Sequence, residues 1–101
     1  MAQQRHIYGD VENRSDLEDV FAAIRDDVEH AGSREALTEL YRRAGYLITL
    51  THAPSWREKF GEKADDLRTT AVQEFATTAR TVNRRAEAIG TNADYDETWG
   101  E

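Results

Sequence analysis

The chain contains no cysteine among its 101 residues, so disulfide bonds, zinc–thiolate sites and thiol chemistry are excluded. It contains a single proline, which leaves few positions at which a helix must end. Apolar runs are short, and the longest, Tyr46 to Ile48, extends only to Leu50 after a threonine. A membrane span needs about 20 apolar residues in succession. We therefore expect no membrane partner.

We also expect no secretory signal, because no apolar stretch follows the first six residues, Met-Ala-Gln-Gln-Arg-His. This pattern predicts a cytoplasmic protein. Acidic residues outnumber basic ones by 20 to 13, giving a net charge of −7. Nucleic-acid-binding proteins usually present a basic field, so we expect no nucleic-acid partner. An acidic mimic of nucleic acid would fit the charge, but the charge is not concentrated in one segment.

Apolar residues recur at three- and four-residue steps along the chain, as in helices that bury one face. The first such segment predicts a helix at about residues 16–30. Ser15 is its expected N-cap, with Glu18 completing a capping box, and Gly32 is the expected residue after its C-cap. The apolar stripe of this helix consists of Leu17, Val20, Phe21, Ile24 and Val28.

A second helix is predicted at about residues 34–52, after an N-cap at Ser33 and before Pro54. Gly45 offers a competing interpretation, in which the helix ends early and residues 46–51 form a β-strand. A lone strand leaves its backbone hydrogen bonds unmade, and no other segment of the sequence offers a partner strand. The helix is therefore favoured, and Gly45 would mark a close approach between helices.

A third, long helix is predicted at about residues 56–89, with Ser55 as its N-cap and Gly90 after its end. A break at Gly61 is the alternative for its first turns. Its apolar positions follow an eleven-residue period, which fits a nearly straight helix. They are Phe60, Ala64, Leu67, Ala71, Phe75, Thr78, Val82, Ala86 and Ile89.

Together these segments predict an all-α fold, in which an antiparallel helical hairpin (about 16–30 and 34–52) packs on the long third helix (about 56–89). The three-helix domain spans residues 15–90. A short polar N-terminal arm, residues 1–14, precedes it, and an acidic C-terminal tail, residues 91–101, follows it.

The expected helix lengths do not match. At 1.5 Å per residue the three helices are roughly 22, 28 and 50 Å long, so the hairpin covers only the first half of the third helix. Phe75, Val82 and Ile89 then lie at or beyond the end of this cover, and an exposed apolar stripe marks a partner surface. We predict these residues as an oligomer interface, with Tyr46 and Leu50 as a second apolar surface. The alternative is that the tails fold back over the stripe.

The sequence offers no catalytic signature. All three serines fall at predicted helix N-caps, and the glycines are too widely spaced for a phosphate-binding loop. The carboxylates are spread over the helix faces without a pair that stands out as general acid and base. We therefore predict a protein that is not an enzyme and needs no cofactor.

A metal site formed between subunits is the alternative function. It would combine Asp26, Asp27 and His30 from the first helix with Glu74, which flanks the stripe of the third helix. Metal sites in helical bundles need several inward-facing carboxylates and histidines, whereas the inward positions here are apolar. The histidines are better explained as surface residues.

Near the end of the third helix lies a small basic cluster, Arg80, Arg84 and Arg85. It indicates either an anion or acidic-partner site, or cations that complement the negative end of a helix dipole. The second interpretation is favoured, with the acidic residues of the tail folding back onto the cluster.

The tail contains two large aromatic residues, Tyr95 and Trp99, in otherwise acidic surroundings. Such side chains seldom stay in water. We expect them to dock within the protein or its oligomer, with another protein as the alternative.

These observations favour a non-enzymatic helical interaction or assembly protein, a small accessory subunit, that self-associates through the projecting half of its third helix. A helical bundle that binds a metal or a small ligand between subunits is the alternative.

Overall fold

The computed structural model describes residues 11–98, which form helices and no strand. Its elements are α2 (Arg14–His30), α3 (Arg34–Thr51), α4 (Pro54–Phe60), the single 3-10 turn η1 (Gly61–Lys63) and α5 (Ala64–Ala88). The predicted all-α class is confirmed, as is the packing of the first two helices on a long third segment. The stretch weighed as a strand continues α3 instead. Predictions for residues 1–10 and for Trp99 lie outside the described residues.

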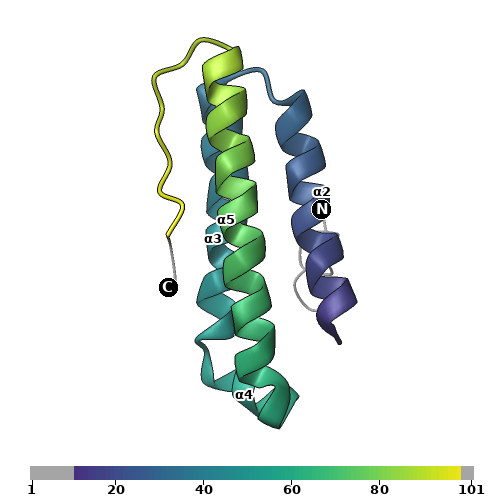
Figure 1. The fold of residues 1–101 in the computed structure, drawn as a ribbon. Helices are drawn as coiled ribbons and strands as arrows, with labels where there is room; N and C mark the ends of the chain where they lie inside the picture. The colour runs from purple at the N-terminus through teal and green to yellow at the C-terminus, as the bar shows by residue number, and fades with distance from the viewer. Residues whose placement is uncertain (1–10, 99–101) are drawn as a thin grey trace.

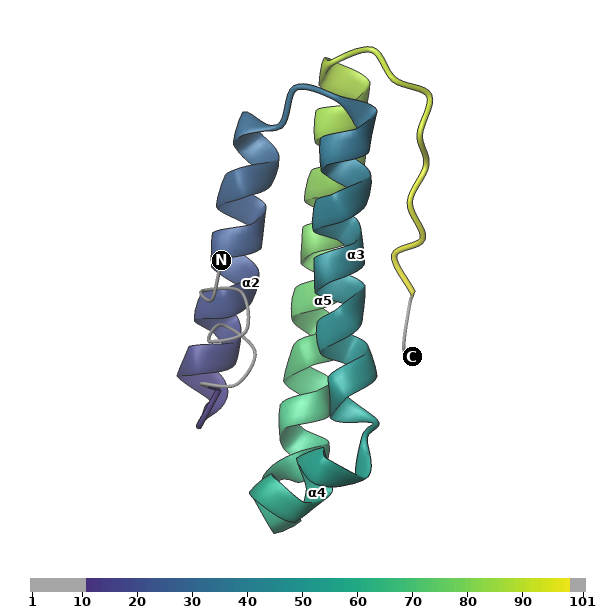
Figure 2. The ribbon, with the colours of Figure 1, turned by 180° about the vertical axis from the view of Figure 1, so that it is seen from behind.

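The helices form an elongated bundle with principal extents of 43 × 30 × 19 Å. Helices α2 and α5 run in the same direction, and α3 runs opposite to both (Figure 1). Helix α4 closes the lower end, where the chain turns from α3 into α5 (Figure 2). No helix of the described part is long and apolar enough to cross a membrane.

Side chains cap the first two helices. The side-chain oxygen of Asn13 accepts a hydrogen bond of 2.9 Å from the backbone N–H of Asp16, so α2 begins at Arg14 and the prediction of Ser15 as its N-cap is wrong. An asparagine side chain forms the same type of cap as a serine. Ser33 accepts from the N–H of Ala36 at 3.1 Å, which confirms it as the N-cap of α3.

The third segment begins earlier than predicted and is bent. Pro54 occupies the first turn of α4, where its missing N–H costs nothing, and Ala53 rather than Ser55 is the N-cap. Helix α4 ends at Phe60, and its C-cap Gly61 has the backbone angles φ 55° and ψ −123°. These angles are accessible to glycine and strained for other residues, because they would bring a Cβ atom against the backbone.

An aromatic side chain stabilises this bend. The indole Nε1–H of Trp56 in α4 donates a hydrogen bond of 3.2 Å to the carbonyl oxygen of Ala64, the first residue of α5. Trp56 is buried, and its ring lies 4.5 Å from that of Phe60, centroid to centroid. The bend is therefore held from both sides of Gly61.

The core runs along the whole of α5, and its buried members come from every helix. Phe75 and Val82 are both 0% exposed, and Ile89 is partly buried against the same core. The expectation that this half of the helix lacks cover is therefore wrong for Phe75 and Val82. Both side chains pack inside a single chain, so neither offers a surface to another copy.

The error comes from the bend at Gly61. Residues 54–63 form the lower end of the bundle, so the helix that runs beside α2 and α3 is only the 25 residues of α5, about 37 Å. Helix α2 is about 25 Å long and α3 about 27 Å. The last turn of α5 lies level with the α2–α3 connection, where Arg85 Nε donates a 2.9 Å hydrogen bond to the carbonyl of Ala31.

The second predicted apolar surface is smaller than expected. Tyr46 is 48% exposed, and among residues 11–98 it is the large hydrophobic residue with an exposed side chain. Leu50, one turn further along α3, is partly buried against the core. A single exposed aromatic ring is ordinary on a protein surface and does not by itself form an interface.

We predict that Gly61→Ala lowers the free energy of unfolding by about 2 kcal/mol, because alanine is strained at this positive φ. Gly32→Ala is the matched control, since Gly32 has no positive φ and a Cβ there meets nothing within 4 Å. Urea unfolding followed by circular dichroism measures both. Equal stability of the two variants would contradict the bend described here.

Val82→Asp tests the corrected position of the stripe. A carboxylate at a fully buried site in one chain is expected to lower the free energy of unfolding by roughly 4 kcal/mol or more. Gln73→Asp on the exposed face of the same helix should cost about 0.5 kcal/mol. If Val82→Asp instead gave a folded chain of lower mass in light scattering, Val82 would lie at an interface between copies.

Candidate functional site

After α5 the chain turns back and runs in extended form along α3 and α5, on the side away from α2 (Figures 1 and 2). We call residues 91–98 the strap. Its residues alternate strictly, with 91, 93, 95 and 97 partly buried and 92, 94, 96 and 98 exposed. This two-residue period is that of an extended strand lying with one face on a surface.

A helix-terminating turn directs the strap onto this surface. Gly90 has φ 82°, and its N–H bonds to the carbonyl of Glu87 at 3.2 Å. The N–H of Thr91 bonds to the carbonyl of Ala86 at 3.0 Å. These two bonds form the Schellman motif that a glycine after a helix favours, so the predicted role of Gly90 is confirmed.

Asn83 of α5 holds the strap by its backbone. Its Oδ1 accepts a 2.7 Å hydrogen bond from the N–H of Tyr95, and its Nδ2 donates one of 2.9 Å to the carbonyl of the same residue. This side-chain amide therefore satisfies both backbone groups of Tyr95, as a residue of a neighbouring strand would in an antiparallel pair. The contact depends on an extended backbone and not on the side chain at position 95.

The side chain of Tyr95 makes a second set of contacts, with α3. Its ring lies 4.9 Å from the ring of Tyr41, which in turn lies 5.5 Å from that of the buried Phe75. Its hydroxyl is hydrogen-bonded to Thr38 Oγ1 at 2.8 Å. Tyr41 also donates to the carbonyl of Asp96 at 3.1 Å. Tyr95 thus docks on its own chain, with its aromatic face covered and its hydroxyl paired.

Of the predicted basic cluster, one residue contacts the acidic tail. Arg80 Nη1 lies 3.7 Å from Glu97 Oε1, and both side chains are about half exposed, 55% and 43%. Exposed pairs of this kind contribute little to stability. Arg84 bonds to the Thr81 hydroxyl, at 3.4 Å. Arg85 bonds to the backbone at the α2–α3 connection instead, so the three arginines do not act as one site.

We call the surface that holds the strap the strap groove, defined by Thr38, Tyr41, Arg80 and Asn83. Two pKa values are shifted, one in the groove and one in the strap. Burial and the nearby Asp96 carboxylate raise the pKa of Tyr41 above its usual value of 10.0. Hydrogen bonds from the backbone N–H and hydroxyl of Thr98 lower the pKa of Asp96.

The structure does not bring the residues of the alternative metal site together. Within residues 11–98, no group of three or more histidines and carboxylates could hold a metal ion. Glu74 accepts a 3.0 Å hydrogen bond from Arg25, which also donates to Thr78. Asp26 and Asp27 are exposed, as is His30, whose Nδ1 lies 2.9 Å from the carbonyl oxygen of Asp26. Glu74 therefore joins α2 to α5.

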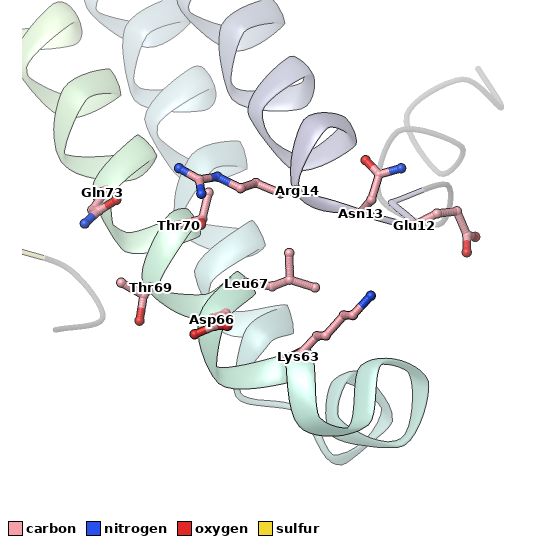
Figure 3. Close-up of a pocket in the computed structure, with 9 residues that line it drawn as sticks. All are labelled: Glu12, Asn13, Arg14, Lys63, Asp66, Leu67, Thr69, Thr70 and Gln73. Atoms are coloured by element: carbon pink, nitrogen blue, oxygen red, sulfur yellow. The ribbon is translucent and has the colours of Figure 1, made fainter.

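A separate open hollow of about 730 Å³ lies between the start of α2 and the start of α5 (Figure 3). Charged side chains of both signs line it, Glu12 and Asp66 with Arg14 and Lys63, and Leu67 forms its apolar floor. Arg14 is already paired with Glu18 at 3.0 Å. The hollow therefore presents a mixed polar surface without an arrangement of groups for acid–base or nucleophilic chemistry.

Sequence reasoning identified Tyr95 but not the residues that receive it. Thr38 and Asn83 are polar residues beside the apolar stripes, and nothing in the spacing of either separates it from other surface residues. Comparison of the chain with models of protein families, with curated proteins and with solved structures finds no match. The strap groove is therefore the candidate site on geometry alone.

Tyr41 makes the stability of the strap depend on pH. A raised folded-state pKa means a contribution to stability that is complete below pH 10 and is lost as the pH rises through the folded value. The difference in free energy of unfolding between the native chain and Tyr41→Phe, from urea unfolding, should therefore shrink above pH 10. Phenylalanine keeps the ring and removes the proton. A difference that stays constant with pH would contradict this assignment.

Proposed function

We propose that the protein is a non-enzymatic helical interaction protein whose binding surface is the strap groove. The observation that carries this proposal is the pair of hydrogen bonds from Asn83 to both backbone groups of Tyr95. A side chain that pairs with an extended backbone binds a peptide segment in a sequence-independent way, and the flanking contacts supply selectivity. Added strands are recognised at sheet edges by the same division of roles.

The free energies of the strap's contacts are those expected for reversible binding. Two hydrogen bonds through Asn83 and one to Thr38 contribute roughly 1 kcal/mol each, and the covered ring of Tyr95 adds about as much again. Ordering an extended segment costs about 1 kcal/mol or more per residue. Over the eight residues of the strap this cost offsets the gain from the contacts, so the segment in the groove is exchangeable.

Self-association remains part of this proposal, on the second of the two apolar surfaces predicted from the sequence. Phe75 and Val82 are buried within one chain. The pair Tyr46 and Leu50 on α3 stays a prediction for a contact between copies. The predictions that the protein is cytoplasmic and binds no nucleic acid rest on the sequence. No described contact favours the alternative, a metal or small-ligand site between subunits.

The test is to supply the strap as a separate molecule. A chain shortened by residues 92–101 should fold, because the fully buried core residues lie between Val11 and Ala86. A synthetic peptide of residues 91–101 is then expected to bind it, and to shift the NMR signals of Thr38, Tyr41 and Asn83. Because the contacts are few, we expect weak binding, with a dissociation constant of roughly 0.1–1 mM.

Asn83→Ala in the shortened chain removes both backbone bonds and should weaken the peptide about 30-fold, the equivalent of about 2 kcal/mol. Asn92, exposed on the strap, offers the matched control: a peptide with Asn92→Ala should bind as the native peptide does. A peptide that shifts no signal in the groove would overturn the proposed function.

A further inference from the structure

The contacts of the strap groove are unevenly distributed along the strap. Positions 93, 95 and 97 face the helices, and each meets a different surface. Ala93 is a small side chain packed against the core, the ring of Tyr95 packs on Tyr41 of α3, and Glu97 lies near Arg80. Positions 94 and 96 point their side chains outward. The groove therefore contacts the side chain of every second residue of an extended segment.

The strap leaves space beside it unfilled. A hollow of about 530 Å³ is lined by Arg80 and Arg84 with Asn83, and by Glu87 and the strap's own Glu97. A second hollow, of about 310 Å³, lies beside Ala93 and Asp94. Glu97 stays 3.7 Å from Arg80, which is outside hydrogen-bonding distance. A segment with better-placed carboxylates would make contacts that the strap does not.

We propose that the strap is an internal competitor in this groove, and that the external ligand is an extended acidic segment of another protein. Its pattern is a small residue, a tyrosine and a carboxylate at alternate positions. This inference rests on the proposed function and adds the class of ligand to it. Charge supports the assignment, since Arg80 and Arg84 line the groove where the carboxylate lies, on a chain whose net charge is −7.

Competition follows from the connection of the strap to α5. Gly90 and three further residues, Thr91 to Ala93, join the helix to the anchoring segment, so the tethered strap is present at a high effective concentration. A free segment with the same contacts is displaced by the strap, and only a segment with additional contacts replaces it. A variant that removes an anchoring side chain of the strap and leaves the groove intact should bind external segments more tightly.

The experiment uses the full chain with Tyr95→Ala and, beside it, the native chain. The probe is a fluorescent peptide of residues 91–98 with the native sequence, followed by polarisation. The Tyr95→Ala chain is expected to bind this peptide at least tenfold more tightly than the native chain, because its own strap has lost the anchoring ring. Equal binding to the two chains would overturn the competitor role.

Peptide variants then test the alternate pattern on the Tyr95→Ala chain. Tyr95→Ala in the peptide should reduce binding at least tenfold. The outward pair Asp94→Asn with Asp96→Asn is the matched control and should change binding less than threefold. Equal losses from inward and outward changes would overturn the proposed ligand class while leaving backbone recognition by Asn83, and thus the proposed function, intact.

The position of the carboxylate is tested by a charge exchange. Arg80→Glu in the Tyr95→Ala chain should weaken the native peptide several-fold, and Glu97→Lys in the peptide should restore binding to that chain. Absence of restoration would overturn the assignment of the carboxylate position. Loss of binding to every form of the chain, the shortened one included, would overturn the proposed function as well.

One further measurement separates a partner protein from a second copy of this chain. Light scattering over a range of concentrations should give the same mass for the native and the Tyr95→Ala chains, because each strap lies in the groove of its own chain. If the mass instead doubled with concentration, and Tyr95→Ala abolished the doubling, the occupant would be the strap of a second copy. That result would overturn the assignment to another protein.

Discussion

The bend at Gly61, held by the hydrogen bond from Trp56 Nε1 to the carbonyl of Ala64, is the constraint on which the rest of the structure depends. It removes ten residues, 54–63, from the long third segment and uses them to close the lower end of the bundle. It thereby sets the height of α5 relative to its neighbours. Without the bend, Phe75 and Val82 would be displaced along the bundle axis, away from the side chains that now bury them.

The position of the strap groove depends on the same constraint. Arg85 bonds to the carbonyl of Ala31, so the end of α5 lies level with the start of α3. In this alignment Asn83 of α5 and Thr38 of α3 lie at the same position along the bundle axis, and Tyr95 bonds to both. The turn at Gly90 then has only to reverse the chain. A binding surface made by two helices requires that their heights be fixed before the segment arrives.

Most of the helices could be predicted from the sequence because their signals are local. Ser33 accepts from a backbone N–H three residues ahead, Pro54 excludes a helical residue before it, and the apolar periods are read over a few turns. The sequence offered a break at Gly61 as an alternative but could not establish it, because a glycine inside a helical pattern is often tolerated. What decides it is Trp56, whose partner is a backbone carbonyl eight residues away and leaves no trace in the apolar pattern.

Of the candidate site, the sequence predicted the docking residue of the strap but not the groove residues that receive it, for a related reason. Tyr95 stands out because an aromatic residue among acids must cover its ring, and that argument needs no structure. Asn83 and Thr38 act through a backbone amide and a hydroxyl that belong to a distant part of the chain. A polar residue of this kind has the same appearance in a sequence whether it faces water or a strap, so geometry alone distinguishes the two.

The energetic separation between core and strap is what makes an interaction role physically reasonable. The fully buried side chains all belong to the helices or to Val11 just before α2, whereas the strap is half exposed along its length. Local opening of a segment with few buried apolar contacts costs much less than global unfolding. The strap can therefore leave the groove while Phe75 and its neighbours stay packed. An exchange of segments in this groove requires a change at the surface, and the helices that form the groove need not move.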